Sequence, residues 1–229
     1  KATLLARGWS PTLAGLGAWT YEAIWCPFAD FFRRYGSSAL LILGLIACYR
    51  ISDVVMGVMS NSFYVDLQFS KTEVATITKV YGVIMTLVGA ALGGVLVMRF
   101  GTLRILFLGA VLTASTNLLF ALLNEVGHNL ELLTMIISLD NLSAGIATAA
   151  FVTYLSSLTN VAFSATQYAL FSSIMLLLPK LLAGFSGRVV EQIGYSHFVI
   201  GTSLLGIPVM ILIIMVAKRG STWSPQTHK

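Results

Sequence analysis

The sequence predicts an all-α membrane protein in which six transmembrane helices form one bundle. The chain of 229 residues is 57% hydrophobic and only 10% charged, with a mean hydropathy of +0.86. A soluble domain carries about 25% charged residues. Several apolar runs of about 20 residues recur, and none alternates with the period of two expected of a membrane barrel. Because only helices and closed barrels satisfy the backbone in lipid, the spans are predicted to be helices.

The basic residues alternate between the two sides of this predicted bundle. Lys71 and Arg188 occupy segments on one side, whereas nine of the fourteen Lys and Arg residues fall in segments on the other side: Lys1, Arg7, Arg33, Arg34, Arg99, Arg104, Lys218, Arg219 and Lys229. The positive-inside rule then places both termini in the cytoplasm. This spacing also explains the net charge of +5 without a nucleic-acid partner.

The predicted organisation has three parts: an interfacial or cytoplasmic segment (1–36), the six-helix bundle (37–217) and a cytoplasmic tail (218–229). The first part contains Trp9, Trp19 and Trp25. Indole rings near basic residues are typical of a segment at the membrane surface. A broken remnant of an earlier span is the alternative. Because the chain begins with Lys1 and not with methionine, we expect it to be part of a longer protein.

The first predicted span, 37–64, carries two charged residues near its centre, Arg50 and Asp53. A charge at the centre of a membrane helix costs roughly 2.5–3.5 kcal/mol, and a spacing of three places both side chains on one helical face. Ser60, Asn61 and Tyr64 extend this face as a polar stripe. The stripe is predicted to face protein or water. The pair is then either a structural ion pair or part of a substrate or proton site.

The second predicted span, about 70–98, begins with a capping box formed by Ser70 and Glu73. Gly89 and Gly93 repeat every four residues, which predicts close packing against a neighbouring helix. Lys79 lies two turns into the span. Its ammonium group either extends to the interface or meets an anion or a carboxylate.

The third span (105–123) carries little chemistry, whereas the fourth (132–155) contains Asp140 and Asn141. A buried aspartate is costly unless it is paired or protonated. Asp140 is therefore a candidate proton carrier or a partner of Lys79 or Arg50.

The fifth predicted span (165–185) begins with Gln167 and Tyr168 and contains Pro179, which removes one backbone hydrogen bond. A bend at this proline is either a gating point or a tolerated kink. The sixth span (198–216) is almost uniformly apolar and ends at basic residues.

No enzyme, cofactor or metal site is expected. The sequence has no G-x-S-x-G, H-E-x-x-H or P-loop motif. Its two cysteines, Cys26 and Cys48, are too few for a metal cage and are not placed for a structural disulfide. Helical spans with ionisable residues facing a common centre instead favour transport.

Five stretches of the chain together suggest one family: Pro27-Phe28-Ala29-Asp30-Phe31-Phe32, Tyr49-Arg50-Ile51-Ser52-Asp53, Thr78-Lys79-Val80-Tyr81-Gly82, Asp140-Asn141-Leu142-Ser143-Ala144-Gly145 and Phe163-Ser164-Ala165-Thr166-Gln167-Tyr168-Ala169-Leu170. They resemble the AmpG family of muropeptide permeases, which are major facilitator transporters. The resemblance covers about 27–216 and implies that this six-helix bundle corresponds to one half of a major facilitator fold, the carboxyl-terminal half.

This resemblance implies a proton symporter that imports anhydromuropeptides across the inner membrane of a Gram-negative bacterium. Such import feeds peptidoglycan recycling and the signal for β-lactamase induction. Sugar hydroxyls and carboxylates of the substrate suit polar and cationic side chains. Asp53 or Asp140 would carry the proton, and the expected substrate-binding residues are Arg50, Lys79, Asn141, Gln167 and Tyr168.

Major facilitators also carry a Gly-x-x-x-Asp-Arg-x-Gly loop motif. Gly94, Arg99 and Gly101 match it and, with Pro179, are the expected gating residues, but Met98 stands where the aspartate belongs. The resemblance therefore gives no support to a gating salt bridge that depends on that carboxylate.

A complete major facilitator places its substrate between two six-helix halves. The expected partners are therefore the lipid bilayer, protons, the anhydromuropeptide and either a missing amino-terminal six-helix half or a second copy of the chain. Two alternatives remain open. One is a related carrier of another bulky anion such as acetyl-CoA, and the other is a truncated, non-transporting membrane interaction module.

Overall fold

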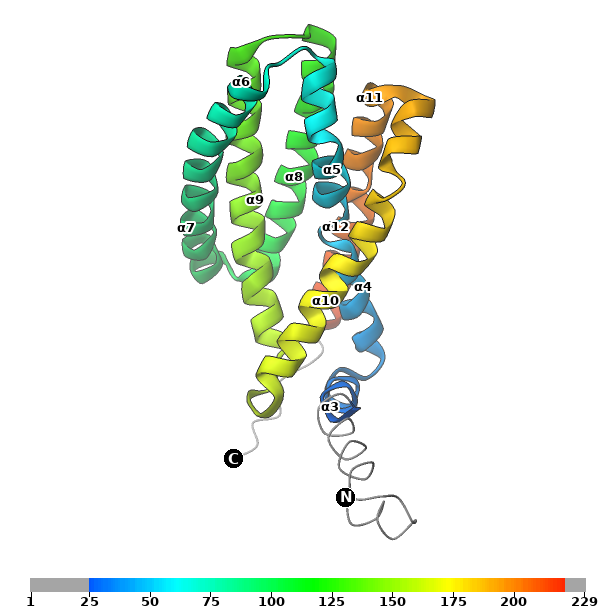
Figure 1. Ribbon diagram of the computed structural model, residues 1–229. Coiled ribbons are helices and arrows are strands. Elements are labelled where there is room, and N and C mark those ends of the chain that lie inside the picture. The colour runs from blue at the N-terminus through cyan, green and yellow to red at the C-terminus, as the bar shows by residue number, and fades with distance from the viewer. Residues whose placement is uncertain (1–24, 221–229) are drawn as a thin grey trace, which may run out of the picture.

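The computed structural model describes residues 25–220, and within this range the chain forms helices joined by short turns, without strands (Figure 1). Six segments are long and apolar enough to cross a membrane. These are Cys26–Asp66, Lys71–Phe100, Thr102–Val126, Leu130–Leu158, Val161–Ala183 and Ser186–Arg219. The predicted six-helix membrane bundle is confirmed, and the chain is a multi-pass membrane protein. Trp9 and Trp19 of the predicted interfacial segment lie outside the described residues.

The segment that contains the first predicted span is helical from Cys26 onward and is interrupted at Arg50. This residue has φ −100° and ψ 9°, outside the helical region. Beside the interruption, the Tyr49 hydroxyl donates to the carbonyl of Leu106 at 3.1 Å, and the Tyr49 ring stacks on Phe151. The span consists of α3 (Cys26–Tyr35), the 3-10 turn η2 (Gly36–Ser38), α4 (Ala39–Cys48) and α5 (Ile51–Asp66).

The second span begins with the predicted capping box, which is confirmed. The amide of Glu73 donates to Ser70 Oγ at 3.2 Å, and the amide of Ser70 donates to Glu73 Oε2 at 2.8 Å. A π-helical turn, which the sequence did not predict, follows and carries Lys79. The span comprises α6 (Lys71–Ile77), the π turn η3 (Thr78–Gly82) and α7 (Val83–Phe100).

Glycines let α7 and α9 (Leu130–Leu158) approach closely. A Cβ atom added at Gly89 would lie 2.2 Å from the carbonyl oxygen of Leu142, and one at Gly145 would lie 2.4 Å from that of Thr86. The predicted close packing through small residues is therefore confirmed. Helix α9 also packs along α8 (Thr102–Val126), so it lies between these two spans.

The last two spans differ from the prediction in where the chain reverses. Gly194 interrupts α11 with φ +75°, a backbone conformation that glycine adopts readily. The chain turns back at this glycine, with helix directly before and after it (Figure 1). The sequence predicted residues 186–197 as the connection between these spans. The elements are η4 (Val161–Phe163), α10 (Ser164–Ala183), α11 (Ser186–Leu204) and α12 (Gly206–Gly220).

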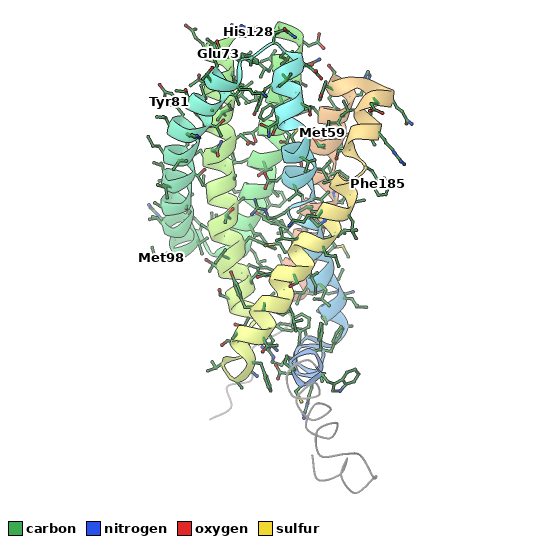
Figure 2. The ribbon with its side chains drawn as sticks, in the orientation of Figure 1. Met59, Glu73, Tyr81, Met98, His128 and Phe185 are labelled. Carbon is green, nitrogen blue, oxygen red and sulfur yellow. The ribbon has the colours of Figure 1, made fainter. Side chains whose placement is uncertain are left out.

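The bundle has two distinct ends. At one end, which we call the basic end, the η2 turn, the start of α8 and the ends of α9 and α12 surround one cavity that includes Arg219. At the opposite end, Glu73 of α6 lies 3.7 Å from His128, and Asn124 donates to Ser196 at 2.8 Å (Figure 2).

The apolar core is divided into two clusters, and polar residues lie between them. Along α8, Ala110 belongs to the cluster at the basic end and Phe120 to the cluster at the opposite end, with Thr116 and Asn117 in between. The same division occurs along α9, where Asp140 separates the two clusters. The fold therefore brings polar residues from several spans to one level of the bundle.

Candidate functional site

An ion pair lies at the interruption of the first span. The Arg50 guanidinium donates to the carboxylate of Asp53, and each side chain is 29% exposed. Arg50 occupies the N-cap position of α5 without a capping hydrogen bond from its side chain, and Asp53 lies in the first turn, where the helix dipole favours an acidic residue. Both residues also line a small space of about 20 Å³, large enough for roughly one water molecule. The structure thus brings the two residues together as one locally neutralised unit.

Asp53 also lines a larger cavity of about 310 Å³, which we call the acidic cavity. The polar stripe predicted on α5 lines this cavity, together with the neighbouring residues Asp140 and Asn141 of α9. Asp53 and Asp140 therefore border the same space. Its lining residues are Asp53, Met56, Gly57, Ser60, Asn61, Tyr64, Thr78, Asn117, Phe120, Ile137, Asp140 and Asn141.

Asp140 is held by a hydroxyl group, and no cation within residues 25–220 pairs with it. Thr116 Oγ1 donates to Asp140 Oδ1 at 3.0 Å, and Asp140 Oδ2 has no hydrogen bond within residues 25–220. Arg50 is already paired with Asp53, and the exposed Lys79 forms no ion pair in the described part of the chain. Neither cation that the sequence offered as a partner therefore pairs with Asp140. One carboxylate oxygen remains for a proton or a ligand.

Asn141 joins α9 to the second span. Its Oδ1 accepts from Thr86 Oγ1 at 3.0 Å, and its Nδ2 donates to the carbonyl of Ile137 at 2.8 Å. A Cβ atom at Gly82 would lie 3.3 Å from Nδ2. The side chain is thus positioned by the close approach of the two spans while it lines the acidic cavity.

The sequence assigned no role to Asn117, which the structure places on the cavity wall. Its Nδ2 donates to Ser52 Oγ at 2.7 Å, and Ser52 in turn donates to the carbonyl of Thr202 at 2.6 Å. Polar residues at 113, 116 and 117 in an otherwise apolar span were the available signal, because they share one helical face.

Gln167 does not reach the acidic cavity. The side chain is 1% exposed, and its Nε2 donates to the carbonyl of Pro27 and to Asp30 Oδ2, both at 3.0 Å. Its Oε1 accepts from the amide of Asn160 at 2.7 Å and from Arg34 at 3.2 Å. An amide has two donors and two acceptor positions, so all four are used.

These contacts form what we call the basic-end network: Asp30, Arg34, Asn160 and Gln167. Arg34 Nε donates to Asp30 Oδ2 at 2.9 Å, and Asn160 Nδ2 donates to Asp30 Oδ1 at 3.2 Å. The network ties α3 to the connection between α9 and α10. Tyr168, the other expected ligand on α10, packs against the apolar cluster of the basic end.

The four expected gating residues also lie away from the acidic cavity. Gly101 has φ +87° and joins α7 to α8, and the Arg99 guanidinium lies 5.5 Å from the ring centroid of Phe100. Pro179 is buried inside α10, which continues to Ala183. Next to the loop, Met98 is 81% exposed on the outside of α7 (Figure 2). Gating by these residues stays a prediction.

Comparison with known proteins finds no matching family model. The candidate transporter AmpG 4 of Rickettsia felis is 33% identical over 202 residues, which are 88% of this chain and 48% of that protein. The anhydromuropeptide permease of Escherichia coli K12 is 32% identical over 195 residues, 85% of this chain and 39% of that protein.

The chain therefore spans about half the length of the curated relatives that it matches, or less. The resemblance to muropeptide permeases is confirmed by these relatives, and the length ratio fits one six-helix half of a longer transporter.

Proposed function

We propose that this AmpG-like chain forms the carboxyl-terminal half of a proton-coupled importer of anhydromuropeptides in the bacterial inner membrane, with its basic end in the cytoplasm. The observation that carries the proposal is the acidic cavity, where Asp53 and Asp140 share one space between two apolar clusters. Ionisable residues inside a membrane bundle mark substrate and proton pathways. The anhydromuropeptide permease among the relatives suggests the substrate. Import of this substrate would feed peptidoglycan recycling and β-lactamase induction.

Within this function, Asp140 is the proposed proton carrier. Asp53 already has a counter-ion in Arg50, whereas the carboxyl group of Asp140 has a hydroxyl donor on one oxygen and, among the residues that the structure describes, no partner on the other. A carboxyl group without a cation gains more from binding a proton than one in an ion pair. A proton on Asp53 is the second possibility, and it would release Arg50 to bind a carboxylate of the substrate.

Arg50, Lys79 and Asn141 remain the proposed substrate ligands. Asn141 lines the acidic cavity, and Arg50 lines the small space beside it. Either side chain can form hydrogen bonds with sugar hydroxyls or carboxylates. Gln167 and Tyr168 are no longer proposed as ligands, because Gln167 has no hydrogen-bonding capacity left and Tyr168 packs against the apolar cluster of the basic end. The opposite wall of the substrate site would come from an amino-terminal half or from a second copy of the chain.

Uptake by the full-length gene product tests the proposal. In proteoliposomes with a pH gradient, Asp140→Asn is expected to reduce uptake of labelled anhydromuropeptide to background, because the amide cannot carry the proton. Substrate exchange without a gradient is expected to continue. Asp53→Asn is expected to weaken uptake by removing the counter-ion of Arg50.

Glu191→Gln is the matched control, since Glu191 is an exposed acid on α11 outside the cavity. Unchanged gradient-driven uptake in both aspartate variants would contradict the assigned roles. Competition by acetyl-CoA would point to a different bulky anion as the substrate.

A further inference from the structure

A second cavity of about 360 Å³ adjoins the acidic cavity toward the opposite end of the bundle. It lies between the end of α5 and the segment formed by α6 and the π turn. We call it the lysine cavity, because its lining includes two lysines and no acidic residue. The lining residues are Asn61, Tyr64, Val65, Phe69, Lys71, Val74, Ala75, Thr78 and Lys79.

The two ammonium groups of this cavity are available to a ligand. Lys71 and Lys79 are both exposed, and neither forms an ion pair within the part of the chain that the structure describes. The nearby carboxylate of Glu73 accepts from the amide of Ser70 and lies 3.7 Å from His128, so its contacts are made elsewhere. The positive charge over the cavity is thus not neutralised by a contact.

The remaining walls of the lysine cavity are mainly apolar. Val65, Phe69 and Val74 contribute to them, and Phe69 is buried, with its ring stacked 4.4 Å from that of His128. Two cations above an apolar floor suit an organic anion that has both carboxylates and aliphatic groups. A small inorganic anion would leave the apolar surface unused.

The lysine cavity and the acidic cavity share three wall residues: Asn61, Tyr64 and Thr78. A molecule that enters from the opposite end would therefore meet two lysines first and two carboxyl groups next. Opposite charges in adjoining spaces favour a ligand whose anionic groups are separated from its hydroxyl-bearing part.

We propose that Lys71 and Lys79 together bind the carboxylates of the transported molecule at the opposite end, while its uncharged, hydroxyl-rich part occupies the acidic cavity. This inference rests on the proposed function and deepens it: the transported class is an amphipathic organic anion. Lys71, on α6, becomes a specificity-determining residue beside Lys79.

The first test measures equilibrium binding to the purified full-length gene product. The two probes are anhydromuropeptide and the same molecule with its carboxyl groups converted to methylamides. Wild-type protein is expected to prefer the acid by about tenfold, as charge-assisted hydrogen bonds to two lysines would provide. The double variant Lys71→Gln, Lys79→Gln is expected to remove this preference, because it weakens binding of the acid and leaves binding of the methylamide unchanged. Lys180→Gln, an exposed lysine of α10 outside both cavities, is expected to keep it.

The second test does not depend on the substrate. With Cys26→Ser and Cys48→Ser as background, Ala75→Cys places one thiol in the lysine cavity. The measured quantity is the rate at which an anionic methanethiosulfonate reagent modifies this thiol, divided by the rate for a neutral reagent. This rate ratio is expected to fall about tenfold when both lysines become glutamine, because the local potential becomes less positive.

The two tests separate the inference from the function on which it rests. An unchanged rate ratio in the double glutamine variant, or an unchanged preference for the acid, would overturn the lysine site. If the rate ratio falls in the double glutamine variant but the wild-type protein binds neither muropeptide probe, the anion site is supported and the proposed substrate is contradicted.

Discussion

The basic-end network and the acidic cavity both place polar side chains inside an apolar bundle, but they satisfy those side chains differently. In the basic-end network, Gln167 is 1% exposed and uses every donor and acceptor of its amide. In the acidic cavity, Asp140 makes one hydrogen bond, to Thr116, and faces about 310 Å³ of space.

This difference separates a structural role from a binding role. A buried polar group that is fully hydrogen-bonded gives up bonds when a ligand competes for it, whereas a partly bonded group beside a cavity gains them. Sequence alone names a candidate site residue in each region, Gln167 in the basic-end network and Asp140 in the acidic cavity. Their hydrogen-bond partners, and not their residue types, distinguish them.

The largest expected effect comes from breaking the basic-end network. Gln167→Ala is expected to lower the free energy of unfolding by about 2–4 kcal/mol, since it leaves a cavity and removes partners from the amide of Asn160 and from Asp30. Thermal unfolding of the purified protein in detergent measures this loss. Asp140→Asn is the contrasting variant: its amide oxygen still accepts from Thr116, so the change is expected to stay below about 1 kcal/mol. Equal destabilisation by the two variants would remove the distinction between the regions.

A smaller effect is expected from a change that alters packing without touching a polar side chain. Gly145→Ala would place a Cβ atom 2.4 Å from the carbonyl oxygen of Thr86, so we expect a loss of about 1–3 kcal/mol as α7 and α9 separate. Gly44→Ala, in α4, meets no atom within 4 Å and is expected to leave stability unchanged or to raise it by up to about 1 kcal/mol. Thermal unfolding measures both changes, and equal stability of the two variants would contradict the proposal that small residues allow α7 and α9 to pack closely.

Features that depend on neighbouring residues could be predicted from the sequence. The capping box of Ser70 and Glu73 involves residues three positions apart, and the polar stripe of α5 follows from the helical period. The close approach at Gly89 was also visible as a repeat of small residues. In each case local spacing determines which groups can meet.

Features that depend on distant residues could not be predicted in this way. Gln167 was expected to be a ligand from the family resemblance, and its structural partners Pro27 and Asp30 could not be foreseen because they are well over a hundred positions away in the sequence. The break at Arg50 and the reversal at Gly194 each depend on the backbone conformation of one residue. The sequence predicted a continuous helix around Arg50 and a connection between spans around Gly194. The adjoining lysine and acidic cavities arise only when α5 packs beside α6 and the π turn.

The most direct test of the central claim is the proton movement that accompanies ligand binding. Anhydromuropeptide is added to the purified full-length gene product in weakly buffered detergent solution across a series of pH values, and a pH-sensitive dye reports protons taken up. Because linked binding is reciprocal, wild-type protein and Glu191→Gln are expected to take up protons as the ligand binds. Asp140→Asn is expected to bind the ligand without that uptake, and an unchanged proton signal in Asp140→Asn would contradict the account.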